Sequence, residues 1–130
     1  MCPVYINRIA SIHAESRNEK PYFSAQEPDY KEMITNANLR RRMSRMIKMG
    51  VACGLECLKD IPSEKVDAII TATGLGCLAD TEKFMNALMD NREQMLNPTA
   101  FIQSTFNTVG AQLALLLKIH AYNVTYVQRG

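Results

Sequence analysis

The stretch STFNTVGAQLALLLKI, residues 104–119, is followed after a short turn by NVTYVQ, residues 123–128, and the two stretches together decide the fold. The first is apolar on nearly every side of a helix, which predicts one helix over residues 104–119 that lies inside a layered core. The second is rich in β-branched and aromatic residues, which predicts a final strand. A helix covered on all sides beside a short strand indicates a layered fold.

An earlier strand is expected over residues 66–73, which are short, β-branched and mostly apolar, as is typical of a strand buried on both faces. Because a helical segment precedes this strand, the order of elements predicts the α/β class. The sequence GLG at residues 74–76 predicts a sharp turn after it. Asp80 is then expected to cap a helix over residues 81–91. The inner side of that helix is predicted to carry Phe84, Leu88 and Met89.

Residues 39–59 carry apolar residues and glycines at steps of three and four, which predicts one continuous helix. The members of this stripe are Leu39, Met43, Met46, Ile47, Gly50, Val51, Gly54 and Leu58. Gly50 and Gly54 each lower helix propensity by about 1 kcal/mol, so their spacing predicts a close approach of another backbone. The opposite side of the helix carries five cations within nine residues, namely Arg40, Arg41, Arg42, Arg45 and Lys48.

The first forty residues are less regular than the rest of the chain. Residues 4–12 alternate apolar side chains such as Val4 and Ile6, which predicts an early, buried strand. Residues 15–38 are polar and contain two prolines, so they predict a loop with at most short local structure.

Composition restricts the classes of function. A chain of 130 residues with 47% hydrophobic and 22% charged residues predicts one globular folding unit, residues 1–130. A net charge of +2 is too small for a general binder of nucleic acid or of a membrane surface, so neither partner is expected. The longest apolar run, residues 113–117, is far shorter than the ~20 residues of a membrane span, which predicts a soluble protein.

Four cysteines could indicate a disulfide framework, but no secretory leader precedes them, so the reducing cytoplasm is the expected compartment. They are Cys2, Cys53, Cys57 and Cys77. Cys53 and Cys57 are four residues apart, whereas redox pairs and zinc knuckles usually place two residues between the cysteines. We therefore expect free thiols, with no metal and no cofactor.

Several features stand in the order found in one known family. The RRM motif of residues 41–43 lies near the start of a helix, GLG ends a strand, Pro98 marks a boundary and Asn107 opens the apolar helix. From Leu39 to Gly130 the chain resembles the β-ketoacyl synthase-like N-terminal domain. The resemblance implies the N-terminal part of a thiolase-like layered fold, with a mixed β-sheet and packed helices.

The resemblance also implies where the chemistry of the family would lie. Counting from Asn107 at the family's spacing places the nucleophilic cysteine of these synthases on Gly130, and glycine cannot form a thioester. The assisting histidines of the family lie in a C-terminal half, and His13 and His120 are not expected to replace them. We therefore expect no condensing activity from this chain, and whether it is an enzyme stays open.

Other roles follow from the resemblance residue by residue. Arg41 and Arg42 match basic residues that dock the acidic acyl carrier protein, and Leu75 matches a residue that lines the acyl pocket. The last strand would pair antiparallel with its counterpart across a two-fold axis, in a homodimer or in a heterodimer with a synthase-like chain. The residues of this dimer strand are Asn123, Val124, Thr125, Tyr126, Val127 and Gln128.

Two departures from the family pattern concern the same end of the chain. Residues 120–122 read HAY where the family usually has Gly-Pro, and residues 127–129 replace small residues ahead of the nucleophile. In both respects the chain resembles the noncatalytic partner subunits of type II polyketide and aryl-polyene-type systems. Fatty-acid or polyketide biosynthesis is the implied setting.

Alternatives remain open for each of these assignments. The arginines could form an ordinary solvated helix face, because most charge runs do. Leu75 could be a core residue. The whole chain could be a non-enzymatic α/β interaction module unrelated to acyl chemistry.

Overall fold

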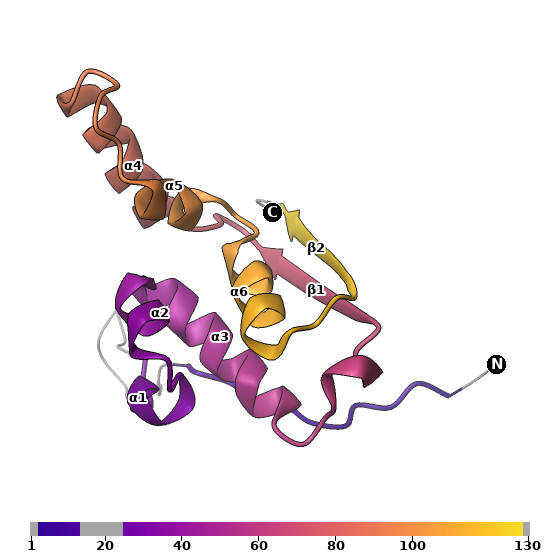
Figure 1. Cartoon of the computed structure of the whole chain (residues 1–130). Coiled ribbons are helices and arrows are strands. Elements are labelled where there is room, and N and C mark those ends of the chain that lie inside the picture. Colours follow the sequence, from indigo (N-terminus) through magenta and orange to yellow (C-terminus); the bar gives the residue numbers. More distant parts are fainter. Residues whose placement is uncertain (1–2, 14–24, 129–130) are drawn as a thin grey trace, which may run out of the picture.

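The computed structural model describes residues 3–13 and 25–128 (Figure 1). The helices are α1 (Tyr30–Met33), α2 (Ala37–Arg42), α3 (Arg45–Leu58), α4 (Leu78–Asp90), α5 (Pro98–Ser104) and α6 (Thr108–Leu117). The strands are β1 (Ala68–Thr73) and β2 (Tyr122–Val127), and a short 3-10 helix, Ser63–Lys65, precedes β1.

Helix α6 lies between helix α3 and the sheet (Figure 1). Strands β1 and β2 pair in parallel, with Ile70 beside Val124 and Thr73 beside Val127. Parallel neighbours need a crossover connection, and here the chain between the two strands forms α4, α5 and α6. The α/β class predicted from the sequence is therefore confirmed, and the final strand lies within one residue of its predicted position.

The core forms where α3 meets the helices around it. Its buried members are Ile34, Met43, Ile47, Val51, Cys77 and Leu113. The predicted apolar stripe is confirmed for Met43, Ile47 and Val51, which are buried. Met46, also predicted to belong to the stripe, is exposed. The predicted close approach at the two glycines is also present, but side chains of α6 make it. An added Cβ would lie 2.7 Å from Val109 Cγ1 at Gly50 and 2.5 Å from Leu113 Cδ1 at Gly54.

The helix expected over residues 39–59 is divided in two. Asn36 caps α2 by accepting hydrogen bonds from the backbone of Asn38 and Leu39. Met43 and Ser44 then adopt extended backbone, and α3 begins at the next residue. The prediction of one helix was wrong because Met43 turns its side chain into the core, where it is 5% exposed, and the chain bends there.

The helix expected over residues 81–91 begins three residues earlier, at Leu78. Asp80 consequently lies in the first turn of α4 and is not its cap, which corrects the prediction. The inner face was predicted correctly for Phe84, whose ring packs against Phe101 of α5 at a centroid distance of 5.6 Å. Met89 is 73% exposed, so its predicted inward position was wrong.

The helix predicted over residues 104–119 is present but shorter: α6 covers Thr108–Leu117, and only Ser104 of the predicted range belongs to α5. Helix α5 ends at Ser104, and Thr105 hydrogen-bonds through its hydroxyl to the carbonyl of Ile102. This local side-chain bond competes with continuation of the helix. Asn107 opens α6, as predicted. Figure 1 shows that α4 and α5 form a hairpin that extends away from α1, α2 and α3.

The predicted early strand over residues 4–12 is absent from the described residues. The segment is extended but unpaired, and Val4 and Ile6 are 95% and 80% exposed. Arg8 donates to the carboxylate of Asp60 at 2.7 Å and to the carbonyl of Glu56 at 3.2 Å. These bonds hold the segment at the C-terminal end of α3, away from the sheet, so the apolar alternation has no strand to pair with.

Only one face of the sheet is covered, which corrects the prediction that β1 is buried on both faces. The residues of β1 that face α6, such as Ile69 and Thr71, are half-buried. Ile70 on the other face is 66% exposed, and Tyr126 of β2 is 60% exposed. Within the described residues nothing packs on that face, so it is available to other protein.

In the part of the chain that the structure describes, no single helix has the length and apolar character of a membrane span. Helices α5 and α6 meet the length and composition criteria only when they are taken together, and they are bent by 110° at the break between them.

Candidate functional site

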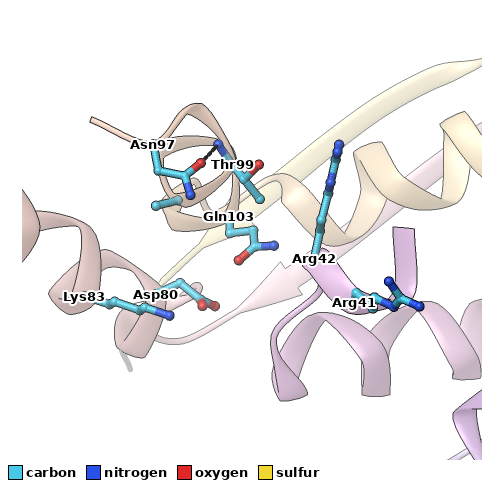
Figure 2. Close-up of a pocket in the computed structure, with 8 residues that line it drawn as sticks. Arg41, Arg42, Asp80, Lys83, Asn97, Thr99 and Gln103 are labelled. Carbon is cyan, nitrogen blue, oxygen red and sulfur yellow. Dashed lines mark hydrogen bonds between the residues drawn. The ribbon is translucent and has the colours of Figure 1, made fainter. Parts of the chain in front are cut away.

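A polar cavity of about 380 Å³ lies between α2 on one side and the hairpin of α4 and α5 on the other. We call it the cationic cavity. Figure 2 shows its lining residues, which are Arg41, Arg42, Asp80, Lys83, Asn97, Thr99, Ala100 and Gln103. Two of them, Arg41 and Arg42, are residues that the sequence singled out.

The wall formed by α2 presents free cations. Arg40 points inward, where its Nη1 donates to the carbonyl of Ile34 and ties α2 to the core. Arg41 and Arg42 are exposed, and within the described residues neither makes a side-chain hydrogen bond or an ion pair. Their charges are therefore available to an external partner.

The opposite wall comes from the hairpin. Asp80 and Lys83 belong to the first two turns of α4, and α5 contributes Thr99 and Gln103. The side chain of Asn97 accepts a hydrogen bond of 2.9 Å from the backbone N–H of Thr99 and caps α5 (Figure 2). This cap fixes the end of α5 that faces the cavity.

The cavity holds three cations and one carboxylate, so it favours an anionic occupant. Exposed ion pairs contribute about 0–1 kcal/mol each and weaken in salt, so such binding would be weak and sensitive to ionic strength. No group of three or more His, Cys, Asp and Glu side chains that could hold a metal ion occurs among residues 3–13 and 25–128.

A second cavity of about 340 Å³ contains Leu75 and lies beside the first. We call it the apolar cavity, since it is lined mainly by Met46, Met49, Leu75, Cys77, Leu78 and Ala79, together with polar Ser44, Arg45 and Asp80. Asp80 lines both cavities, so the two cavities adjoin at this residue. Leu75 is 57% exposed, so it is not a residue of the protein core.

The turn before Leu78 places Leu75 at the mouth of this cavity. Gly76 has a φ of +60°, a conformation that glycine adopts without strain, and its N–H donates to the hydroxyl of Thr73 at 3.0 Å. Cys77 is buried directly after the turn, and burial raises the pKa of its thiol. The thiol is therefore held in its neutral form.

Other predicted site residues lie apart from the two cavities. Residues 123–127 belong to β2, and Gln128 follows it with its N–H donating to the carbonyl of Thr73. One edge of β2 pairs with β1, and the other edge has no partner among the described residues. Gly130, the predicted nucleophile position, lies outside the described residues. His13 and His120 line neither cavity.

Cys53 and Cys57 lie one turn apart on α3 as free thiols, and both are half-buried. Burial, followed by the charge of the neighbouring Cys57, raises the pKa of Cys53. Cys2 lies outside the described residues.

The sequence did not identify Lys83, Asn97, Thr99 and Gln103 as members of a site. A weak signal was available for Asn97 alone, because Asn before Pro98 is a typical start of a helix. The other three join the site only through the folding of the hairpin against α2, which no local pattern encodes.

Comparisons with known proteins agree with the fold. The chain matches the family described as the β-ketoacyl synthase N-terminal domain over residues 13–125. A search of curated proteins returned no match. Among solved structures, the chain is similar to the ketosynthase ApeO from Xenorhabdus doucetiae, determined in complex with its chain length factor ApeC.

The similarity to that structure has a TM-score of 0.62 and 25% sequence identity, and it covers 83% of this chain. It covers 41% of the other chain, so this chain spans less than half of the length of that relative. The layering of α3, α6 and the parallel strands is accordingly that of a thiolase-like fold. The family match includes the whole of the cationic cavity and most of β2, and the chain belongs to the β-ketoacyl synthase N-terminal domain family.

Proposed function

We propose that this chain is the N-terminal portion of a 3-oxoacyl-[acyl-carrier-protein] synthase-like protein of fatty-acid or polyketide biosynthesis. It acts in carrier docking and in dimerisation, and it does not itself condense acyl groups. The observation that carries this proposal is the pair of free, exposed guanidinium groups of Arg41 and Arg42 on the cationic cavity.

Acyl carrier proteins are acidic, so a cationic recess attracts them and raises the rate of encounter. The position of the cavity supports this role because the apolar cavity with Leu75 lies next to it and shares Asp80 with it. A docked carrier would thus present its acyl chain beside an apolar recess.

We propose that this chain does not condense acyl groups because the resemblance places the nucleophile position of the family on Gly130. Condensation in this family needs a thiolate to hold the acyl group, and glycine has no side chain to supply one. We propose that a second, synthase-like chain supplies the active site. The ketosynthase that this chain resembles was determined in complex with its chain length factor, which supports a paired arrangement.

Two surfaces of this chain are suited to pairing. The second edge of β2 offers unpaired backbone groups, which form a template for another strand. The hairpin also exposes apolar side chains, including Met85, Met89, Phe101 and Ile102. We propose that β2 pairs across a two-fold axis and that the protein works in the cytoplasm, where its cysteines would stay reduced.

The proposal on carrier docking is tested by binding of a fluorescently labelled acyl carrier protein to the full chain. We expect Arg41→Glu with Arg42→Glu to weaken binding by at least about tenfold, which corresponds to ~1.4 kcal/mol. Lys59→Glu with Lys65→Glu is the matched control, since it makes the same change of charge on exposed residues outside the cavity. Equal binding by both double variants would instead favour an interaction module without a link to acyl chemistry.

The proposal on pairing is tested by sedimentation of the chain at micromolar concentration, alone and mixed with a catalytically active β-ketoacyl synthase. We expect a dimer in one of the two samples and its loss on Thr125→Pro, which removes a backbone donor from β2. A monomer in both samples would contradict dimerisation and leave carrier docking untouched.

A further inference from the structure

We propose that the acidic carrier is held between two walls, so that Lys83 of α4 contacts it together with Arg41 and Arg42 of α2. In the same cavity, Asp80 of α4 repels acidic groups that come close to it. This inference rests on the proposed function, because it assigns further residues to the docking of the same partner.

Lys83 lies across the cationic cavity from the two arginines and belongs to a different element (Figure 2). Its side chain is exposed. The ion pairs among the described residues are Arg8 with Asp60 and Arg45 with Glu27, so Lys83 forms no ion pair there, although Asp80 lies near it on the same helix (Figure 2). A free cation on the hairpin therefore complements the free cations on α2.

The size of the cavity allows both walls to act on one occupant. A sphere of about 380 Å³ is roughly 9 Å across, which is close to the screening length of about 8 Å at physiological salt. A carboxylate inside the cavity thus lies within electrostatic reach of all three cations. Two carboxylates on neighbouring turns of a carrier helix, about 5.4 Å apart, fit within this width, while the helix itself, about 10–12 Å across, stays outside the cavity.

Asp80 has the opposite effect. It is half-buried, it lines the cavity from α4, and it carries the only negative charge among the lining residues of the cationic cavity. An acidic group placed near Asp80 is repelled, whereas acidic groups on either side of it meet a cation. The cationic cavity therefore selects a partner by the positions of the partner's acidic groups as well as by their number.

The neutral lining residues support this arrangement. Thr99 and Gln103 of α5 belong to the hairpin wall and offer a hydroxyl and an amide to an anionic occupant. Ala100 beside them leaves the space open. A helix of the partner could therefore approach without displacing a bulky side chain.

The test is binding of the same labelled acyl carrier protein to the full chain and to single variants, at low and at physiological salt. We expect Lys83→Glu to weaken binding by about five- to twentyfold and Lys83→Gln to weaken it less. Lys65→Glu, an exposed lysine outside the cavity, is the control and should stay within about twofold of the parent. Asp80→Asn should strengthen binding at least about twofold. Lys83→Gln should also make binding less dependent on salt, which a merely structural effect would not do.

The outcomes separate the two proposals. If the arginine variants lose binding and Lys83→Glu does not, Lys83 does not contact the carrier. This result overturns the further inference and leaves the proposed function standing. Unchanged binding in all variants overturns both. Loss of carrier binding in Lys83→Glu alone means that the hairpin docks the carrier without α2. This result also overturns the proposal that both walls contact the carrier. Weaker or unchanged binding by Asp80→Asn overturns the part assigned to Asp80. Melting curves of each variant show whether the fold is retained, and because Lys83 is exposed we expect it to be.

Discussion

The side-chain amide of Asn123 in β2 donates a hydrogen bond of 3.0 Å to the backbone carbonyl of Gly110 in α6. An added Cβ at Gly110 would lie 2.7 Å from the amide oxygen of Asn123 and 2.9 Å from the hydroxyl of Thr71. Helix α6 therefore rests on both strands at a distance that only glycine allows.

Gly110→Ala should destabilise the chain by about 1–3 kcal/mol, because the added methyl group forces the helix off the sheet and disturbs the bond from Asn123. The gain in helix propensity, at most about 1 kcal/mol, acts in the opposite direction and is smaller. Urea unfolding measures the difference. Gly74→Ala is the control, since the nearest atom to its Cβ is 3.8 Å away, and equal stability of both variants would contradict the close contact.

The contact between Gly54 and Leu113 should appear as a coupling between the two positions. Gly54→Ala alone is expected to destabilise because its Cβ would lie 2.5 Å from Leu113 Cδ1. In a background of Leu113→Ala the same change should cost much less, which gives a coupling free energy of at least about 1 kcal/mol in a double-mutant cycle. Additive effects of the two changes would mean that α3 and α6 do not touch at this point.

Acid should remove the contribution of Glu27 to stability. The hydroxyl of Tyr30 and the guanidinium of Arg45 both donate to its carboxylate, and these bonds lower the pKa of Glu27 below its ordinary 4.5. Because the folded pKa is the lower one, the stabilisation is complete above pH 4.5 and disappears as the pH falls through the folded pKa. The stability difference between the parent and Glu27→Gln should therefore be present at pH 7 and shrink as the pH is lowered below 4.5. A difference that persists in acid would contradict this.

Cys77 should be the slowest of the described cysteines to react with iodoacetamide. It is 5% exposed, and burial raises the pKa of its thiol, so both access and the thiolate population are low. Peptide mass spectrometry at pH 7.5 should show Cys57 modified first and Cys77 only after unfolding in urea. Rapid modification of Cys77 in the folded chain would show that the turn at Gly76 opens.

The sequence predicted the α/β class, the positions of β1 and β2 and a close approach of another element to α3, because each depends on a local period or on paired glycines. It failed where a tertiary contact overrides the local pattern. Residues 4–12 alternate like a strand, yet the bonds of Arg8 hold them beside α3. The apolar character of β1 predicted burial on both faces, but Ile70 stays exposed because no described element covers that face.

The candidate site was predictable only in part for a similar reason. Arg41 and Arg42 form a run that any charge count finds, and resemblance to a family gave them a role. Lys83 is one of several scattered lysines, and only the fold of the hairpin brings it opposite them. The residues next to Lys83 in the sequence form no pattern that would identify it as part of a site, because its position depends on contacts between separate elements.

Any substitution of Asp80 is expected to affect two cavities at once. Because Asp80 lines both the cationic and the apolar cavity, a substitution chosen to alter the charge of one also alters the lining of the other. The lining of the cationic cavity and that of the apolar cavity therefore cannot be changed separately by a substitution at this residue.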